Sequence, residues 1–378
     1  MSFSRRDFLK TLGVGAAAGI SAESVPRASA EGLAEAGSGP IRLDNNESAY
    51  GPSGKVVEAI RLAAVETNRY PSSGRAYELA ERISQSHKVS PDQVVLGAGS
   101  TEILRMASCL FLGTGKQLVQ PLPTFPDLEF YARAVGSEVI SDPLTPRFSH
   151  DLDAMLAHSA AKTGVVYICN PNNPTASITP RGELEKFIAR LPSSCCILID
   201  EAYHHYAGQS GAYASFLDRP LNDPRIVVSR TFSHVYGLAG LRIGYGIASS
   251  AVARRMRAFA TAHGVSTIAV AAAMAALDDT ASLSQFVKKN ADNRQEFWNT
   301  AYTRSLKPID SHANFLAVNT FNPANLVIQH FRSNNILIAP VSLSWDTWIR
   351  VSLGKPDEMR AFWGAWDTLP IDKSSVRH

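Results

Sequence analysis

The sequence predicts an α/β fold in which helices pack against a central sheet. The first observation is a set of short apolar runs with the length and composition of buried strands, at residues 94–96, 117–120, 164–169, 196–199 and 225–229. The second is a set of longer segments whose apolar residues recur with helical spacing, at residues 56–67, 76–86, 266–277 and 282–303. The third is residues 94–102, where an apolar run passes through a glycine turn into a helix start, as strands do in α/β proteins.

The composition is that of an ordinary soluble enzyme. Of the 378 residues, 45% are hydrophobic and 19% are charged, and this length suits two unequal domains. A net charge of +3 is too small to form a basic face for nucleic acid or an anionic membrane. The cysteine spacing fits neither disulfides nor zinc, so no metal is expected, and four small buried hydrophobes are predicted: Cys109, Cys169, Cys195 and Cys196.

The first thirty residues have the pattern of a twin-arginine export signal. Arg5 and Arg6 precede a weakly apolar stretch at residues 11–22, and residues 28–30, Ala-Ser-Ala, provide a cleavage site. The apolar stretch is far shorter than the roughly 20 residues of a membrane-spanning helix, so no stable membrane association is expected. The sequence therefore predicts that residues 1–30 are a signal peptide, that the twin-arginine machinery is a partner, and that the folded protein is periplasmic or secreted.

The rest of the chain is expected to divide into an arm, a large domain and a small domain. Residues 43–53 form a loop that ends at a helix start, and residues 266–303 form an alanine-rich segment followed by a polar helix that would bridge two domains. Apolar runs at residues 314–318 and 348–354 predict strands beyond that bridge. The predicted boundaries are 31–67 for the N-terminal arm and part of the small domain, 68–278 for the large domain, and 279–378 for the small C-terminal domain.

Residues 231–245 have the composition of a phosphate-binding loop. The hydroxyls of Thr231 and Ser233 can donate to phosphate oxygens, and Arg242 offers a planar set of donors suited to bidentate contact. The glycine turn before Ser100 and Thr101 supplies a helix N-terminus, whose free N–H groups and positive dipole also favour an anion. Together these segments predict a phosphorylated ligand.

Two charged residues lie where burial would be costly without a ligand. Asp200 ends a short apolar strand, at the position where α/β sheets bind ligands, and a buried carboxylate there needs a cationic partner. Arg350 lies within a predicted strand among apolar neighbours, which favours contact with an anion.

The pattern Thr-x-Ser-x-x-x-Gly-Leu-Ala-Gly-Leu-Arg-x-Gly-Tyr at residues 231–245 resembles the cofactor loop of fold type I aminotransferases, which use pyridoxal 5′-phosphate (PLP). It is most similar to the histidinol-phosphate aminotransferase branch. The resemblance covers nearly all of the chain after the signal peptide, with the motifs in the expected order. It implies a mostly parallel central sheet with helices on both faces, a smaller α+β domain, a small-molecule amino donor and acceptor, and a homodimer.

The resemblance also implies roles for residues that match the family's motifs. The PLP phosphate would be held by Ser100, Thr101, Thr231, Ser233 and Arg242, and by Tyr70 reaching across to the other subunit of the dimer. The ring and its substituents would be contacted by Phe125 through stacking, Asp200 at the ring nitrogen, and Asn173 and Tyr203 at the phenolic oxygen. Arg350 would bind the substrate carboxylate. Ala176 stands where the family's Asn-Pro-Thr-Gly motif has its glycine.

One position departs from the family, because His234 stands where its members have the lysine that holds PLP as a Schiff base. Imidazole is not a primary amine and cannot form that bond. It can carry out the lysine's second task, proton transfer, which needs a positioned base of near-neutral pKa. We therefore expect PLP, or its amine form pyridoxamine 5′-phosphate, to be held without a covalent bond, with His234 and Tyr203 as the catalytic residues.

Three functions are compatible with these residues. The first is an aminotransferase-like reaction with His234 as the base. The second is pyridoxamine-phosphate-dependent, dehydratase-type chemistry on a keto substrate, since a ketosugar dehydratase of this fold resembles the chain in having histidine at this site. The third is a non-catalytic protein that binds the cofactor or a ligand.

The substrate is expected to differ from histidinol phosphate. The histidinol-phosphate branch has a second arginine upstream of the Arg350 match, which holds the substrate phosphate, and here that position is Ala339. Export would also separate the protein from cytoplasmic histidine synthesis. The sequence thus favours an amino acid or an amino-bearing natural product.

Overall fold

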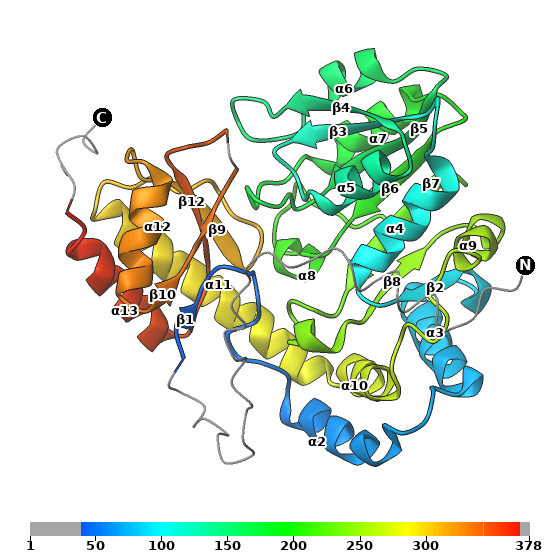
Figure 1. Cartoon of the computed structure of the whole chain (residues 1–378), viewed down its shortest axis with the longest axis horizontal. Helices are drawn as coiled ribbons and strands as arrows, with labels where there is room; N and C mark the ends of the chain where they lie inside the picture. The colour runs from blue at the N-terminus through cyan, green and yellow to red at the C-terminus, as the bar shows by residue number, and fades with distance from the viewer. Residues whose placement is uncertain (1–38, 343, 371–378) are drawn as a thin grey trace, which may run out of the picture. The chain divides into compact units, whose positions relative to one another are not determined.

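The computed structural model describes residues 39–342 and 344–370, so the predicted signal peptide lies outside the described residues. Seven strands form the central sheet in the order β2-β8-β7-β6-β5-β3-β4 (Figure 1). Their bounds are β2 Val94–Gly97, β3 Gln117–Leu122, β4 Glu138–Pro143, β5 Thr163–Cys169, β6 Cys196–Asp200, β7 Ile226–Thr231 and β8 Gly244–Ile247. β8 runs in the direction opposite to the other six strands, which are parallel to one another, so the prediction of a mostly parallel sheet is confirmed.

Helices cover both faces of this sheet because its strands are apolar on both sides. Along β5, Val165 and Tyr167 belong to one buried cluster, whereas Val166 and Ile168 belong to another. The first cluster includes residues of α4 (Ser100–Phe111), α5 (Asp127–Ala134) and α9 (Ser250–Arg257). The second includes residues of α2 (Gly54–Ala63), α3 (Ser73–His87), α6 (Leu152–His158), α7 (Arg181–Arg190) and α10 (Thr267–Asp278). Strands of this kind are typical of parallel sheets.

A three-stranded antiparallel sheet, in the order β11-β12-β9, adjoins another core. Its strands are β9 Phe315–Asn319, β11 Ala339–Pro340 and β12 Trp348–Ser352. The rings of Phe297, Phe331 and Phe362 join three helices in this core: α11 Thr280–Tyr302, α12 Ala324–Ser333 and α13 Pro356–Asp367. Strand β1 (Ile41–Arg42) pairs in parallel with β10 (Ile336–Leu337), which attaches the start of the arm to the same core.

Glycine lets helix α4 begin close to strand β8. A Cβ atom on Gly244 would lie 2.4 Å from the backbone nitrogen of Ser100, so any side chain there would displace the helix. Because Gly244 and Gly246 interrupt its apolar character, β8 lacks the apolar run that identifies its neighbours in the sequence.

The prediction that all four cysteines are buried is wrong for one of them. Cys169, Cys195 and Cys196 are buried free thiols, whereas Cys109 is half-buried. Cys109 lies in the last turn of α4, where the adjacent Leu110 and Phe111 are also partly exposed because this end of the helix reaches the surface.

Candidate active site

A cavity of about 400 Å³ opens at the carboxyl ends of three neighbouring strands. Cys169, Asp200 and Thr231 are the last residues of β5, β6 and β7, and all three line it. This is the edge at which parallel sheets bind ligands. Every predicted site residue except Tyr70 lines the cavity: Ser100, Thr101, Phe125, Asn173, Asp200, Tyr203, Thr231, Ser233, His234, Arg242 and Arg350.

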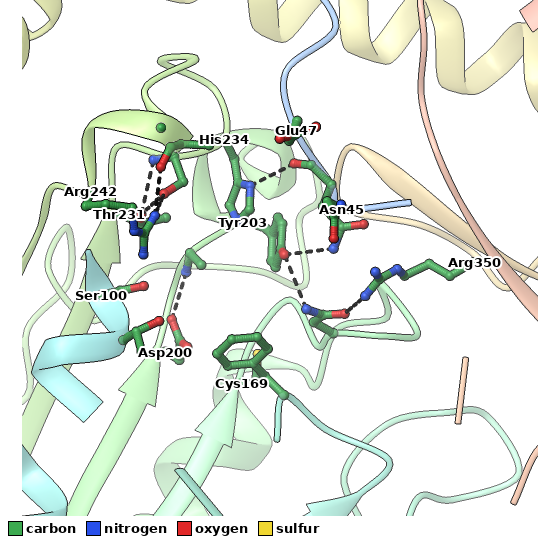
Figure 2. A pocket seen from close by; sticks show the side chains of 18 residues that line it. Asn45, Glu47, Ser100, Cys169, Asp200, Tyr203, Thr231, His234, Arg242 and Arg350 are labelled. Carbon is green, nitrogen blue, oxygen red and sulfur yellow. Dashed lines mark hydrogen bonds between the residues drawn. The ribbon is translucent and has the colours of Figure 1, made fainter. Parts of the chain in front are cut away.

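One side of the cavity is built from a helix start and Arg242 (Figure 2). Helix α4 follows Gly99, whose φ of +79° suits glycine, and no side chain caps the helix. A Cβ atom on Gly99 would lie 2.3 Å from Nη2 of Arg242, so the absence of a side chain makes room for the guanidinium. Nη1 of Arg242 donates to the backbone oxygen of Ala239 over 2.8 Å. Within the described residues Arg242 has no ion-pair partner, so its charge remains available to an anion.

Two hydroxyls lie beside this guanidinium. The Thr231 hydroxyl donates to Oγ of Ser233 over 2.9 Å and accepts from the Ser233 N–H over 3.1 Å. Nη1 of Arg242 lies 3.5 Å from the same Ser233 oxygen. Fixed hydroxyls, a helix N-terminus and a free cation together form a side of the cavity that suits a phosphate.

Asp200 is a buried carboxylate that pairs with no cation in the described part of the chain. Its Oδ2 accepts from the Tyr167 hydroxyl over 3.1 Å, and its Oδ1 accepts from the N–H of Ala202 over 3.2 Å. Burial raises the pKa of Asp200 to about 6, and these two hydrogen bonds only partly offset that effect. The carboxylate therefore favours a ligand that brings its own positive charge.

Arg350 lies on the opposite side of the cavity from Arg242, with Tyr203 between them (Figure 2). Nη1 and Nη2 of Arg350 donate to Oδ1 of Asn173 over 2.8 Å and to the backbone oxygen of Asp44 over 2.6 Å. The Tyr203 hydroxyl accepts from the side-chain amides of Asn46 over 3.0 Å and Asn173 over 3.4 Å. Because both amides are donors, the hydroxyl hydrogen of Tyr203 remains free for a ligand oxygen.

His234 lines the cavity as a neutral ring. Its imidazole stacks on the Tyr203 ring with a centroid distance of 4.3 Å and an interplanar angle of 19°. Its Nδ1 lies 2.8 Å from the backbone oxygen of Asn46. Burial, with a smaller contribution from the positive charges of Arg350 and Arg242, lowers the pKa of His234 to about 4, although the hydrogen bond to Asn46 opposes this effect.

The arm contributes three cavity residues that the sequence did not single out: Asn45, Asn46 and Glu47. Asn46 is buried and has a φ of +57°, and both its backbone and its side chain take part in hydrogen bonds. The sequence of residues 44–48 is unusually polar and has neither helical nor strand periodicity. It indicated a loop but no individual role.

Tyr70 lies outside the cavity. Its side chain is 79% exposed and packs against His263 with a centroid distance of 4.6 Å. Its predicted role in the other subunit of a dimer therefore stays a prediction. Ala176, where the family's motif has glycine, adopts a φ of +59°, a conformation in which alanine is less favourable than glycine.

His204 and His205 begin the short helix α8 (His204–Ala207). Their Nε2 atoms lie 3.1 Å apart, and His204 also contacts the guanidinium of Arg230, which forms a buried ion pair of 2.8 Å with Glu201. In residues 39–342 and 344–370, no three histidine, cysteine or acidic side chains are grouped to hold a metal. These two histidines are thus engaged in internal polar contacts.

Comparison with known proteins identifies the family. Residues 38–365 match the family described as aminotransferase class I and II. The chain belongs to this family. Residues 2–21 match the TAT (twin-arginine translocation) pathway signal sequence. The predicted family and the predicted fold type I are therefore confirmed.

Relatives in the aminotransferase family include histidinol-phosphate aminotransferase 2 of Pseudomonas aeruginosa, which is 36% identical over 85% of this chain and 87% of the relative. Histidinol-phosphate aminotransferase 2 of Carboxydothermus hydrogenoformans is 34% identical over 85% of this chain and 88% of its own length. Among solved structures, histidinol-phosphate aminotransferase from Sinorhizobium meliloti in complex with PLP has a TM-score of 0.81 and 29% identity. That comparison covers 89% of this chain and 91% of that one.

The donor set of this member of the aminotransferase family fits PLP, the cofactor of the family. The phosphate would meet Arg242 and the start of α4, where a cation has no ion-pair partner in the described region. The ring nitrogen, when protonated, would meet Asp200, a carboxylate that likewise lacks an opposite charge there. Phe125 also lines the cavity and offers an apolar ring for stacking.

Proposed function

We propose that the protein is a PLP-dependent enzyme of the aminotransferase type that acts on an amino acid or amino-bearing metabolite and holds its cofactor without a covalent bond. One observation carries this proposal. Asp200 and Arg242 line one cavity, and neither forms an ion pair within the described residues. PLP carries a cation at its ring nitrogen and anionic oxygens at its phosphate, so one ligand satisfies both.

Non-covalent binding is supported by the residues around the cavity. None of the cavity-lining residues in the described chain is a lysine, so the site offers no side-chain primary amine. When bound, PLP supplies an electron sink for the α-carbon of the substrate. Arg350 would bind the substrate carboxylate, and His234 would move the proton. Anionic groups on Arg242 and Arg350 would offset the two charges that lower the pKa of His234, bringing it closer to neutral.

A second candidate is pyridoxamine-phosphate-dependent chemistry on a keto substrate. The same two observations favour it, namely the absence of a lysine among the described cavity residues and the presence of an imidazole that can carry a proton. A protein that only binds the cofactor is the third candidate.

The functional test supplies purified protein with PLP and a panel of amino acids. We expect PLP to bind, the amino acid to be converted to its keto acid, and H234N to lower the rate by about 10²- to 10⁴-fold. Keto-acid formation is measured by coupled absorbance, with heat-inactivated protein and free PLP as controls. Turnover of a keto sugar with pyridoxamine phosphate would favour the second candidate, and binding without any product would favour the third.

The substrate pocket favours carboxylates over phosphates. Ala339 of β11 pairs directly with Arg350 of β12, so both side chains lie on one face of the sheet. A339R would place a second guanidinium beside the first. We expect the ratio of kcat/KM for histidinol phosphate to kcat/KM for amino acids to rise roughly tenfold to a hundredfold. A339Q introduces a polar side chain without a charge, so the ratio of the two kcat/KM values should stay close to that of the wild type. A wild-type protein that turned over histidinol phosphate alone would contradict this specificity.

A homodimer is supported by exposed hydrophobic side chains on one segment of the chain: Val57, Leu62, Val65, Tyr70 and Tyr77. All five lie within residues 57–77, and exposed large apolar side chains of this kind are candidates for contact with a second subunit. V65D should convert the dimer to a monomer in sedimentation velocity, whereas L326D, at an exposed leucine of α12, should not.

Tyr70 is proposed to contact the PLP phosphate of the other subunit. Y70F removes only the hydroxyl, so it should keep the dimer and weaken PLP binding by roughly two- to tenfold. A wild-type monomer with full PLP affinity would be incompatible with the proposed contact.

The proposed location is the periplasm or the medium outside the cell, reached by the twin-arginine route. The match of residues 2–21 to the signal sequence of that pathway supports it. Within the described residues, no helix has both the length and the apolar character required to cross a membrane.

The proposed division is a large domain at residues 68–278 and a small domain at residues 279–378. Separate apolar clusters beside the seven-stranded and three-stranded sheets support it. Residues 41–43 of the arm join the smaller sheet's core, whereas Val56 of α2 packs in the core shared with α10.

A further inference from the structure

Asn46 is the arm residue that contacts the proposed base. Its backbone oxygen lies 2.8 Å from Nδ1 of His234. Its side-chain amide donates over 3.0 Å to the hydroxyl of Tyr203, the residue on which the His234 ring stacks. One residue thus contacts the imidazole directly and also holds the aromatic ring beneath it.

The bond to Asn46 decides which ring nitrogen of His234 carries the hydrogen. A backbone carbonyl oxygen can only accept, so Nδ1 must be the donor in this 2.8 Å contact. A neutral imidazole has one N–H group, so Nε2 is left with a lone pair. No side chain or backbone group in the described structure forms a hydrogen bond with this Nε2, which leaves it available to a ligand.

Asn46 is itself held in place from several directions. Its N–H donates to the Ser352 hydroxyl over 2.8 Å. Its backbone oxygen accepts a second hydrogen bond, from the Asn314 amide, over 2.9 Å. Its φ of +57° is a conformation that asparagine adopts more readily than most residues. The position of the carbonyl is therefore fixed by bonds other than the one to the histidine.

The same segment is connected to the proposed carboxylate-binding residue. Ser352 lies two residues after Arg350 in β12, and Arg350 donates to the backbone oxygen of Asp44 over 2.6 Å. Arm residues 44–46 therefore form hydrogen bonds with Arg350 and Ser352 of β12 and with the imidazole of His234.

We infer that Asn46 is a positioning residue that holds His234 in its Nδ1–H form, so that Nε2 receives the proton from the substrate α-carbon. In this step the C–H bond breaks, its electron pair stays with the substrate, and the proton forms the new Nε2–H bond. The Nδ1–H bond to Asn46 persists in the resulting imidazolium. The inference rests on the proposed role of His234 as the base, but the tautomer exists without any ligand.

The test reads the tautomer directly by nuclear magnetic resonance of ¹⁵N-histidine-labelled protein without added cofactor. The His234 signals are assigned by their loss in H234Q. We expect an unprotonated Nε2 and a protonated Nδ1 near neutral pH. A predominant Nε2–H form would overturn the inference. Failure of PLP to bind would instead count against the proposed function and leave this measurement unaffected.

Variants separate the role of Asn46 from general folding. N46G adopts the positive φ without strain but loses the side-chain amide that donates to Tyr203. S352A removes the hydroxyl that accepts from the Asn46 N–H. Each should shift the tautomer ratio roughly two- to tenfold toward Nε2–H. S48A, two residues further along the arm and outside the cavity, should leave the ratio unchanged. Thermal unfolding checks that each variant is folded. An unchanged ratio in both N46G and S352A would overturn the positioning role.

Discussion

Replacing His234 with lysine is expected to attach PLP covalently to the protein. The new amine in H234K would lie in the cavity where the imidazole now stacks on Tyr203. Burial near Arg350 and Arg242 would favour a neutral lysine amine, which is the nucleophilic form. After borohydride reduction and denaturation, we expect about one PLP label per chain of H234K, which mass spectrometry should locate at residue 234. The wild type should retain only a background amount of label. Keto-acid formation should also increase, because lysine can serve both to hold the cofactor and to move the proton.

The matched control for this experiment is H234R. Arginine has similar length and also ends in nitrogen donors, but it has no primary amine, so it separates the effect of a long side chain from that of covalent attachment. H234R should show no retained label. If H234K retained no more label than H234R, the cavity would not hold the PLP carbonyl near residue 234. If wild type itself retained a label on any protein amine, the non-covalent proposal would be wrong.

Much of the fold and of the candidate site could be predicted because side chains at strand ends follow recognisable apolar runs. β5, β6 and β7 are short and apolar, and each ends at a cavity residue: Cys169, Asp200 or Thr231. Asp200 and Thr231 line the same cavity because the carboxyl ends of neighbouring parallel strands share one edge of the sheet.

Other parts could not be predicted because they depend on the backbone. The contact of Asn46 with His234 uses a carbonyl group, which every residue has, and a positive φ that the loop sequence does not reveal. The edge strand β4 is too polar, and β8 too rich in glycine, for either to stand out as an apolar run. Tyr70 was identified only through the family motif, since its exposed position gives it no contact with the cavity of its own chain.

Replacing Asp200 with asparagine is expected to weaken PLP binding while stabilising the protein without cofactor. Asparagine keeps the shape and one oxygen, which can accept from Tyr167, so D200N removes the charge and the hydrogen bond from the Ala202 N–H. Breaking a buried ion pair costs about 3–5 kcal/mol, which corresponds to a rise in the PLP dissociation constant of about 100-fold to several thousand-fold. The dissociation constant of PLP is measured by equilibrium dialysis. Y167F, which removes a hydrogen bond but keeps the charge, should weaken binding by roughly tenfold or less.

The opposite effect on stability follows from the raised pKa of Asp200. The unfolded carboxyl ionises near its ordinary pKa of 3.8, whereas the folded one ionises at about 6. The unfolded state therefore loses its proton first, and the folded state loses stability as the pH rises from about 4 to 6, by on the order of 3 kcal/mol. D200N lacks this loss, so above pH 6 its cofactor-free form should melt at a higher temperature than wild type. With excess PLP the wild type should have the higher melting temperature, because it binds PLP more tightly and is therefore stabilised more. A D200N protein that was both less stable without cofactor and unchanged in PLP affinity would show that Asp200 serves the core and not the ligand.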